Sequence, residues 1–160
     1  MPLGGQATHP FLKDYGRRVG LEENKVRETT ITTAQILALH STAITVVPDP
    51  GTGKVIVVEG CLVFYDYNSA AYAAIAGGDD LSLNFESDAS GSQLMSMETT
   101  GFLDQTSDQT RWFNANVTNV TCQASEPVAV KLLGAITTGD SPLRIRVYYR
   151  IVDLAPPTGV

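Results

Sequence analysis

The sequence predicts an all-β fold, an antiparallel β-sandwich with an extended N-terminal arm. Residues 55–66 (VIVVEGCLVFYD) are dominated by β-branched and aromatic side chains, which fit a pleated sheet, and Gly60 in the middle indicates a bulge or bend. Residues 143–153 (LRIRVYYRIVD) alternate between apolar side chains and three arginines, as in a half-buried strand (Arg144, Arg146 and Arg150). Short strands separated by turn residues recur along the chain, which is typical of sandwiches and barrels.

The composition is that of one folded domain. The chain has 160 residues, of which 43% are hydrophobic and 18% charged, with a formal net charge of -6. This charge argues against duplex nucleic acid as a partner. No apolar run is long enough to span a membrane, and the N-terminus lacks the pattern of a signal peptide, so we expect synthesis in a cytoplasm. Cys61 and Cys122 are expected to be buried free thiols.

Residues 1–26 differ from the rest and are expected to form an extended arm. Prolines and glycines near its start indicate irregular structure, and large apolar residues lie between charged ones further along (Pro2, Gly4, Gly5 and Pro10; Phe11, Leu12, Tyr15 and Val19). Such a segment is too short and too polar to build its own core. It either remains a disordered tail or docks on a neighbouring subunit, and its apolar residues favour docking.

The sandwich domain is expected over residues 27–154, followed by an exposed tail at 155–160. A short helix is expected at 33–40, with Thr32 or Thr33 as its cap and with Ile36 and Leu39 packed inward. Residues 48–53 (PDPGTG) indicate a hairpin turn, and a helical turn is expected near 70–76. The expected strands cover the following ranges: 26–33, 43–47, 55–66, 81–86, 93–100, 111–116, 117–123, 127–134 and 143–153.

No catalytic, cofactor or metal site is predicted. Residues 51–54 (GTGK) resemble a phosphate-binding loop, but Pro48 stands where that motif needs its first glycine and Val55 where it needs serine or threonine. His9 and His40 are the only histidines, which is too few for a cupin-like metal enzyme. The acidic loop residues fit solvated loops better than a paired-acid or calcium site (Asp79, Asp80, Glu86, Asp88, Asp104 and Asp108).

Trp112 is the one aromatic residue that suggests a ligand. Beside Arg111 and Phe113 it would suit a sugar-stacking platform, although core packing or a subunit interface is the more common use of such a residue. The glycan-acceptor patterns at 116–118 and 119–121 carry little weight without a secretion signal.

Five segments within residues 30–153, about three-quarters of the chain, carry a family resemblance, and none is a catalytic signature: ITTAQILAL (31–39), ITVVPDPGTGKVIVVEG (44–60), YNSAAYAAIAGG (67–78), TTGFLDQTSDQTR (99–111) and ITTGDSPLRIRVYYRIVD (136–153). Together they resemble a recurring type of tailed-bacteriophage virion protein. The resemblance is to capsid cement or decoration proteins, which stabilise the head.

The resemblance implies a jelly-roll body, a homotrimer and a non-enzymatic role on the outer surface of the capsid, bridging capsomers. The partner would be the major capsid protein, contacted through the arm by three apolar and two basic residues (Phe11, Leu12, Tyr15, Arg17 and Arg18). The alternative is a tail, fibre or baseplate module that binds host glycan through a groove near Trp112, Asp104 and Asp108.

Overall fold

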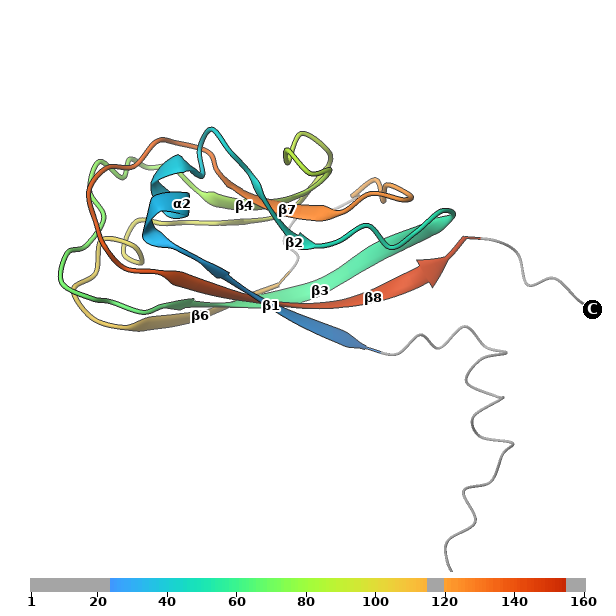
Figure 1. Cartoon of the computed structure of the whole chain (residues 1–160), viewed down its shortest axis with the longest axis horizontal. Helices are drawn as coiled ribbons and strands as arrows, with labels where there is room; N and C mark the ends of the chain where they lie inside the picture. The colour runs from blue at the N-terminus through green and yellow to red at the C-terminus, as the bar shows by residue number, and fades with distance from the viewer. Residues whose placement is uncertain (1–23, 115–119, 155–160) are drawn as a thin grey trace, which may run out of the picture.

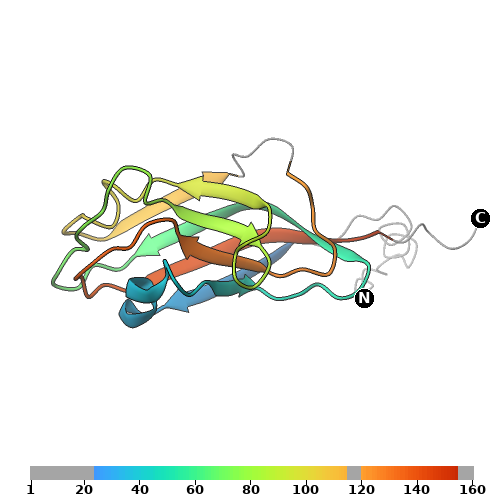
Figure 2. The same cartoon turned by 90° about the horizontal axis from the view of Figure 1, so that it is seen from above.

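A computed structural model describes residues 24–114 and 120–154, and the arm residues named above lie outside that part. The described chain forms two packed antiparallel sheets of four strands each (Figures 1 and 2). Sheet A has the order β1-β8-β3-β6 and sheet B the order β2-β7-β4-β5. The elements are β1 (Lys25–Ile31), α2 (Thr33–Ala38), β2 (Ile44–Val47), β3 (Lys54–Tyr65), β4 (Leu81–Phe85), β5 (Gln93–Met97), β6 (Gln109–Asn114), β7 (Val128–Leu132) and β8 (Leu143–Asp153).

This strand order is that of a jelly roll, and the predicted fold class is confirmed. Every pairing is antiparallel, and β4 and β5 are the one pair of consecutive strands that lie side by side within a sheet. Every other connection between the named strands passes from one sheet to the other. The two sheets therefore share one core between them, as eight-stranded double-sheet folds do.

The two longest strands, β3 and β8, lie side by side in the middle of sheet A. β3 and β8 pair over the whole length of β8, from Lys54 opposite Asp153 to Tyr65 opposite Leu143. The register shifts between Val58 and Gly60, so the bulge predicted at Gly60 is present. The hairpin predicted at 48–53 is wrong, because β2 pairs with β7 in sheet B and β3 belongs to sheet A. The turn crosses between sheets instead.

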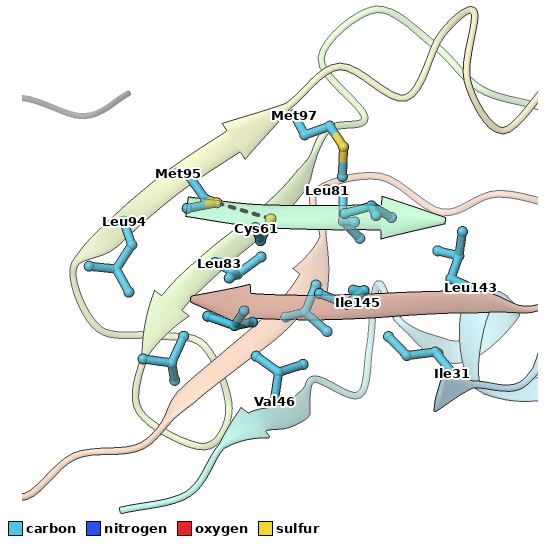
Figure 3. Packing of buried hydrophobic residues seen from close by; sticks show 14 of the residues in the cluster. Ile31, Val46, Cys61, Leu81, Leu83, Leu94, Met95, Met97, Leu143 and Ile145 are labelled. Carbon is cyan, nitrogen blue, oxygen red and sulfur yellow. Dashed lines mark hydrogen bonds between the residues drawn. The ribbon is translucent and has the colours of Figure 1, made fainter. Parts of the chain in front are cut away.

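The core is filled by the inward side chains of both sheets (Figure 3). Cys61 of β3 lies between the layers, and its Sγ is 3.4 Å from Sδ of Met95 on β5. Burial raises the pKa of Cys61 to about 12, so its thiol stays protonated. Both cysteines are free, as expected, but Cys122 is exposed, which corrects its predicted burial.

Local sequence explains the single short helix in the described chain. The Thr32 side chain accepts a hydrogen bond from the Gln35 backbone, while the Gln35 side chain accepts one from the Thr32 backbone, which completes a capping box. Ile36 and Leu39 are fully buried, as predicted. The helical turn expected at 70–76 is absent, because Ala73 forms an isolated bridge with Thr137. Residues 120–123 form no strand, so the part of the 117–123 prediction that the structure describes is wrong.

Candidate interaction surface

The outer face of sheet A is the most distinctive surface of the described chain. Alternation along β8 turns its even-numbered residues from 144 to 150 away from the core, and the register places β1 and β3 residues beside them. We call this surface the outer A face. Its side chains come from all four strands and from Asp66, which directly follows β3: Val26, Glu28, Val57, Glu59, Leu62, Phe64, Asp66, Trp112, Arg144, Arg146, Tyr148 and Arg150.

An aromatic pair lies at the centre of the outer A face. The rings of Trp112 and Tyr148 have centroids 5.1 Å apart and planes tilted by 58°. The Trp112 ring lies over Gly60, where an added Cβ would come within 2.6 Å of its Cζ2 atom. Val26 pairs with Tyr148 across the β1–β8 ladder, and 55% of Val26 and 49% of Trp112 remain exposed. A continuous apolar strip therefore crosses the sheet.

Ion pairs between strands flank this strip. Arg144 donates two hydrogen bonds to Asp66, at 2.7 and 2.9 Å, and these lower the pKa of the Asp66 carboxyl. Arg146 donates two to Glu28, at 2.9 and 2.7 Å. These two guanidinium groups also lie 4.5 and 5.5 Å from the ring centroid of Phe64.

A third pair completes the set. Nε of Arg150 lies 2.8 Å from Oε1 of Glu59, close enough for an ion pair but without hydrogen-bond geometry. Three guanidinium groups thus face three carboxylates, and the outer A face carries no net charge.

The outer face of sheet B is different in character. The side chains on the outer side of β4 and β5 are polar, as the pairs of Ser82 with Ser96 and of Asn84 with Gln93 illustrate, and Ser82 is fully buried among its neighbours. They bond to one another: Gln93 Nε2 donates to Ser82 Oγ at 3.0 Å, and Ser82 Oγ donates to Asn84 Oδ1. Neither large exposed apolar side chains nor arginines occur among these four residues.

The structure separates the residues of the predicted glycan groove. Trp112 is not a core residue, which leaves the subunit interface and the sugar platform as its possible uses. Alternation along β6 puts Arg111 on the opposite side, with its guanidinium 4.9 Å from the Phe102 ring centroid, and Arg111 helps to lower the pKa of Asp104 after hydrogen bonding from Gln105. Asp108 accepts a hydrogen bond from the Tyr67 backbone at 2.9 Å. Asp104 is thus a loop residue on the Arg111 side of β6, opposite Trp112, and Asp108 is a loop residue before β6 that is bonded to the chain just after β3.

The other candidate chemistry has simple structural roles. Residues 51–54 form the turn before β3, where Gly51 and Gly53 adopt positive φ angles of 96° and 72°, and His40 is exposed. Within residues 24–114 and 120–154, no group of three or more histidine, cysteine or acidic side chains is placed to hold a metal ion. In the same ranges no helix is long and apolar enough to cross a membrane.

Three of the five segments that carry the resemblance meet at one end of the sandwich. Tyr65 lies in an aromatic cluster with ring centroids 6.3 Å from Tyr72 and 5.9 Å from Phe102, which belong to the 67–78 and 99–111 segments. The Tyr72 hydroxyl donates to the Ser141 carbonyl at 2.6 Å, which ties in the 136–153 segment. Asp140 accepts hydrogen bonds from the backbone of Ser69 and Ala70 at 3.0 and 2.8 Å, and these hold the loops together.

Comparisons with known proteins return little. No family model and no curated protein matches the chain. Among solved structures, a chain from the capsid asymmetric unit of cyanophage Pam1 is similar, with 17% identity over 94% of this chain and 91% of that chain. The TM-score is 0.43, and a likeness at this level carries no information on function.

Sequence reasoning found only part of the outer A face. It placed the arginines of β8 on one side of a strand, but it missed Val26 and Tyr148 as members of an exposed apolar strip. The missing signal is long-range pairing: Glu28 and Arg146 are 118 positions apart in the chain, and Asp66 and Arg144 are 78 apart. A strand pattern identifies which residues share a face but not which strand lies beside it.

Proposed function

We propose that this chain is a structural protein of a bacteriophage virion, a cement or decoration protein that binds the outer surface of the capsid and bridges capsomers. It acts as a homotrimer, without catalysis, and its N-terminal arm contacts the major capsid protein. The observation that carries this proposal is the resemblance of five segments of the chain to phage virion proteins. Three of these segments pack against one another at one end of the jelly roll.

The attachment of the arm suits this role. The described chain begins at Asn24, directly before β1, and β1 is an edge strand of sheet A. All seven residues of β1 pair with β8, from Lys25 opposite Tyr149 to Ile31 opposite Leu143. A force that pulls on residues 1–24 in the direction of β1 would act on all seven residue pairs between β1 and β8 at once, rather than breaking them one after another. Force from a pressurised shell would thus pass into the middle of the sandwich.

Several weak contacts on one oligomer can hold such a protein on a shell. Each arm adds a small apolar and basic contact, and a trimer engages three of them at the effective concentration set by the body. The prediction is that Phe11, Leu12, Tyr15, Arg17 and Arg18 supply the contact. The body needs only to be rigid and soluble. Its filled core provides the rigidity, and the net charge of -6 on the whole chain favours solubility.

The test is binding of the full-length protein to preassembled shells of the major capsid protein, followed by cosedimentation. Adding the protein after assembly restricts binding to the outer surface. Replacement of Phe11, Leu12 and Tyr15 together by alanine should weaken binding about tenfold or more, because the arm loses its large apolar contacts. Leu3→Ala is the matched control, since it changes an apolar arm residue outside the predicted contact.

The outcomes separate the role of the protein from the role of the arm. Absence of wild-type binding to shells would contradict the capsid function. Wild-type binding that the triple variant retains at full affinity would leave the function in place and show that the arm residues are assigned wrongly.

A further inference from the structure

We infer that the outer A face is the surface through which copies of this chain associate with one another. The inference rests on the homotrimer of the proposed function, which does not specify the surface through which the copies associate. Capsid binding does not enter the reasoning, so the two can fail separately.

Of the five large hydrophobic side chains that are exposed in the described chain, two lie on this face, on either side of one tyrosine. These two are Val26 and Trp112. Between them lies Tyr148, which is paired with Val26 and is 5.1 Å from the Trp112 ring. Half-buried Leu62 and Phe64 extend the strip along β3. Aromatic residues and arginine with few unpaired charges are the composition of interface centres.

Charge selects another copy of the chain as the occupant. The chain carries a net charge of -6, while the three carboxylates and three guanidinium groups of the outer A face cancel one another. All of the net negative charge therefore lies elsewhere on the protein. Two copies repel each other through their other surfaces, but they can meet through this face without that repulsion.

The size of the face predicts weak, reversible association. Four strands about 4.8 Å apart and about 25 Å of strand length give roughly 500 Å² per copy. That is about the smallest area that each partner buries in a specific interface. We therefore expect a dissociation constant in the micromolar range for the free protein, with tighter association once copies are held side by side on a larger assembly.

A sugar platform fits the face less well. The planes of Trp112 and Tyr148 are tilted by 58°, so they do not offer one flat surface to successive sugar rings. The polar groups nearest the pair are already occupied, since Trp112 Nε1 donates to Asn114 Oδ1 at 2.7 Å and Glu28 accepts both hydrogen bonds from Arg146.

Trp112 is the single tryptophan of the chain, so its fluorescence reports directly on the centre of the face. The experiment is a dilution series of the full-length protein without shells. The mass is followed by light scattering, and the access of acrylamide to Trp112 is followed by fluorescence quenching. We expect the mass to fall toward that of a monomer as the protein is diluted, with quenching rising over the same concentrations.

Three variants locate the contact. Val26→Glu places a carboxylate at a position that is 55% exposed and should raise the dissociation constant about tenfold while keeping the Trp112 signal. Trp112→Ala should also raise the dissociation constant, which is then measured from the mass alone. Leu133→Ala, at an exposed apolar position beyond the end of β7, should leave the association unchanged. Thermal unfolding of each variant checks that the fold is intact, and Val26→Glu, which changes no core residue, decides the matter if Trp112→Ala unfolds.

Several results would overturn the inference. One is a monomer at every concentration, and another is an oligomer in which Trp112 remains equally accessible to quencher at all concentrations. A folded Val26→Glu variant with the dissociation constant of the wild type would also overturn the inference. Binding of an oligosaccharide by a monomeric protein, lost in Trp112→Ala, would assign the face to glycan instead. Binding to shells is measured separately and decides only the proposed function.

Discussion

Gly60 is where a single methyl group should disturb the outer A face most. An added Cβ would lie 2.6 Å from Cζ2 of Trp112 and 2.8 Å from the backbone oxygen of Phe113. Ordinary contacts of carbon atoms are about 3.5–4.0 Å, so Gly60→Ala must displace both. The Trp112 ring can turn toward solvent, but the Phe113 oxygen belongs to β6, which is held to β3 from Gly60 to Tyr65.

These contacts set the size of the effect. Inserting a methyl group at a well-packed position costs about 1–3 kcal/mol, and loss of the contact between Trp112 and Tyr148 adds about 0.5–1.5 kcal/mol. Alanine recovers about 0.4–1 kcal/mol by restricting the unfolded chain, since Gly60 does not need a positive φ. The expected net loss is about 1–3 kcal/mol in the free energy of unfolding, or about 3–10 °C in Tm for a domain of this size.

Urea unfolding followed by circular dichroism and by Trp112 fluorescence measures both consequences. Gly77→Ala is the matched control, because a Cβ there has no neighbour within 4 Å. Combining Gly60→Ala with Trp112→Ala separates the two contacts, since the clash with the Phe113 oxygen remains in the double variant. The explanation would be refuted if Gly60→Ala were as stable as the Gly77 control and left the Trp112 emission unchanged.

Two further predictions concern titration and reactivity. Hydrogen bonds from Ser69 and Ala70 lower the pKa of Asp140 from its ordinary 3.8 to about 2, so this carboxylate favours the folded state above pH 3.8 and loses that effect as the pH falls through 2. The free energy of unfolding should therefore decrease less between pH 5 and pH 2 in Asp140→Asn than in the wild type. An equal decrease in both proteins would contradict this. Exposed Cys122 should react with a thiol reagent at about pH 8 in the folded protein, whereas buried Cys61, whose pKa is raised to about 12, should react only after unfolding. Two native thiols reacting at one rate would refute the assignment.

The elements predicted well are those whose signal is local. The alternation of residues 143–153 gives β8 with its observed bounds, because one side chain in two must face the core. The short helix was predicted from its cap and from the helix formers that follow, and Gln35 supplies the other half of the capping box. In each case the interactions that specify the element lie within a few residues of one another.

The errors arise where the deciding contact is distant. Residues 48–53 have the composition of any tight turn, and only the pairing of β2 with β7 and of β3 with β8 shows that the chain changes sheets there. Cys122 has apolar and β-favouring neighbours, but no strand at 120–123 turns its side chain inward. The exposure of Trp112 depends on which face of sheet A is left uncovered by the other sheet, which no local pattern records.

The bulge at Glu59 connects the core with the outer A face. Ile56 and Val58 point inward before it, and Cys61 and Val63 point inward after it, so the inward positions of β3 change from even to odd numbers. β8 alternates without interruption from Leu143 to Arg150, and because Glu59 is left out of the ladder, both halves of β3 stay in phase with β8.

The same irregularity shapes the exposed surface. The extra residue, Glu59, reaches Arg150, and the next residue, Gly60, leaves room for the Trp112 ring beside Tyr148. Deletion of Glu59 would remove the unpaired residue and leave both halves of β3 in phase with β8, so the strands should stay paired without the bulge and without the contact to Arg150. Glu59→Gln keeps the bulge, and it should preserve the fold while removing one of the charges that make the face neutral. Backbone geometry and surface charge can thus be changed separately at one position.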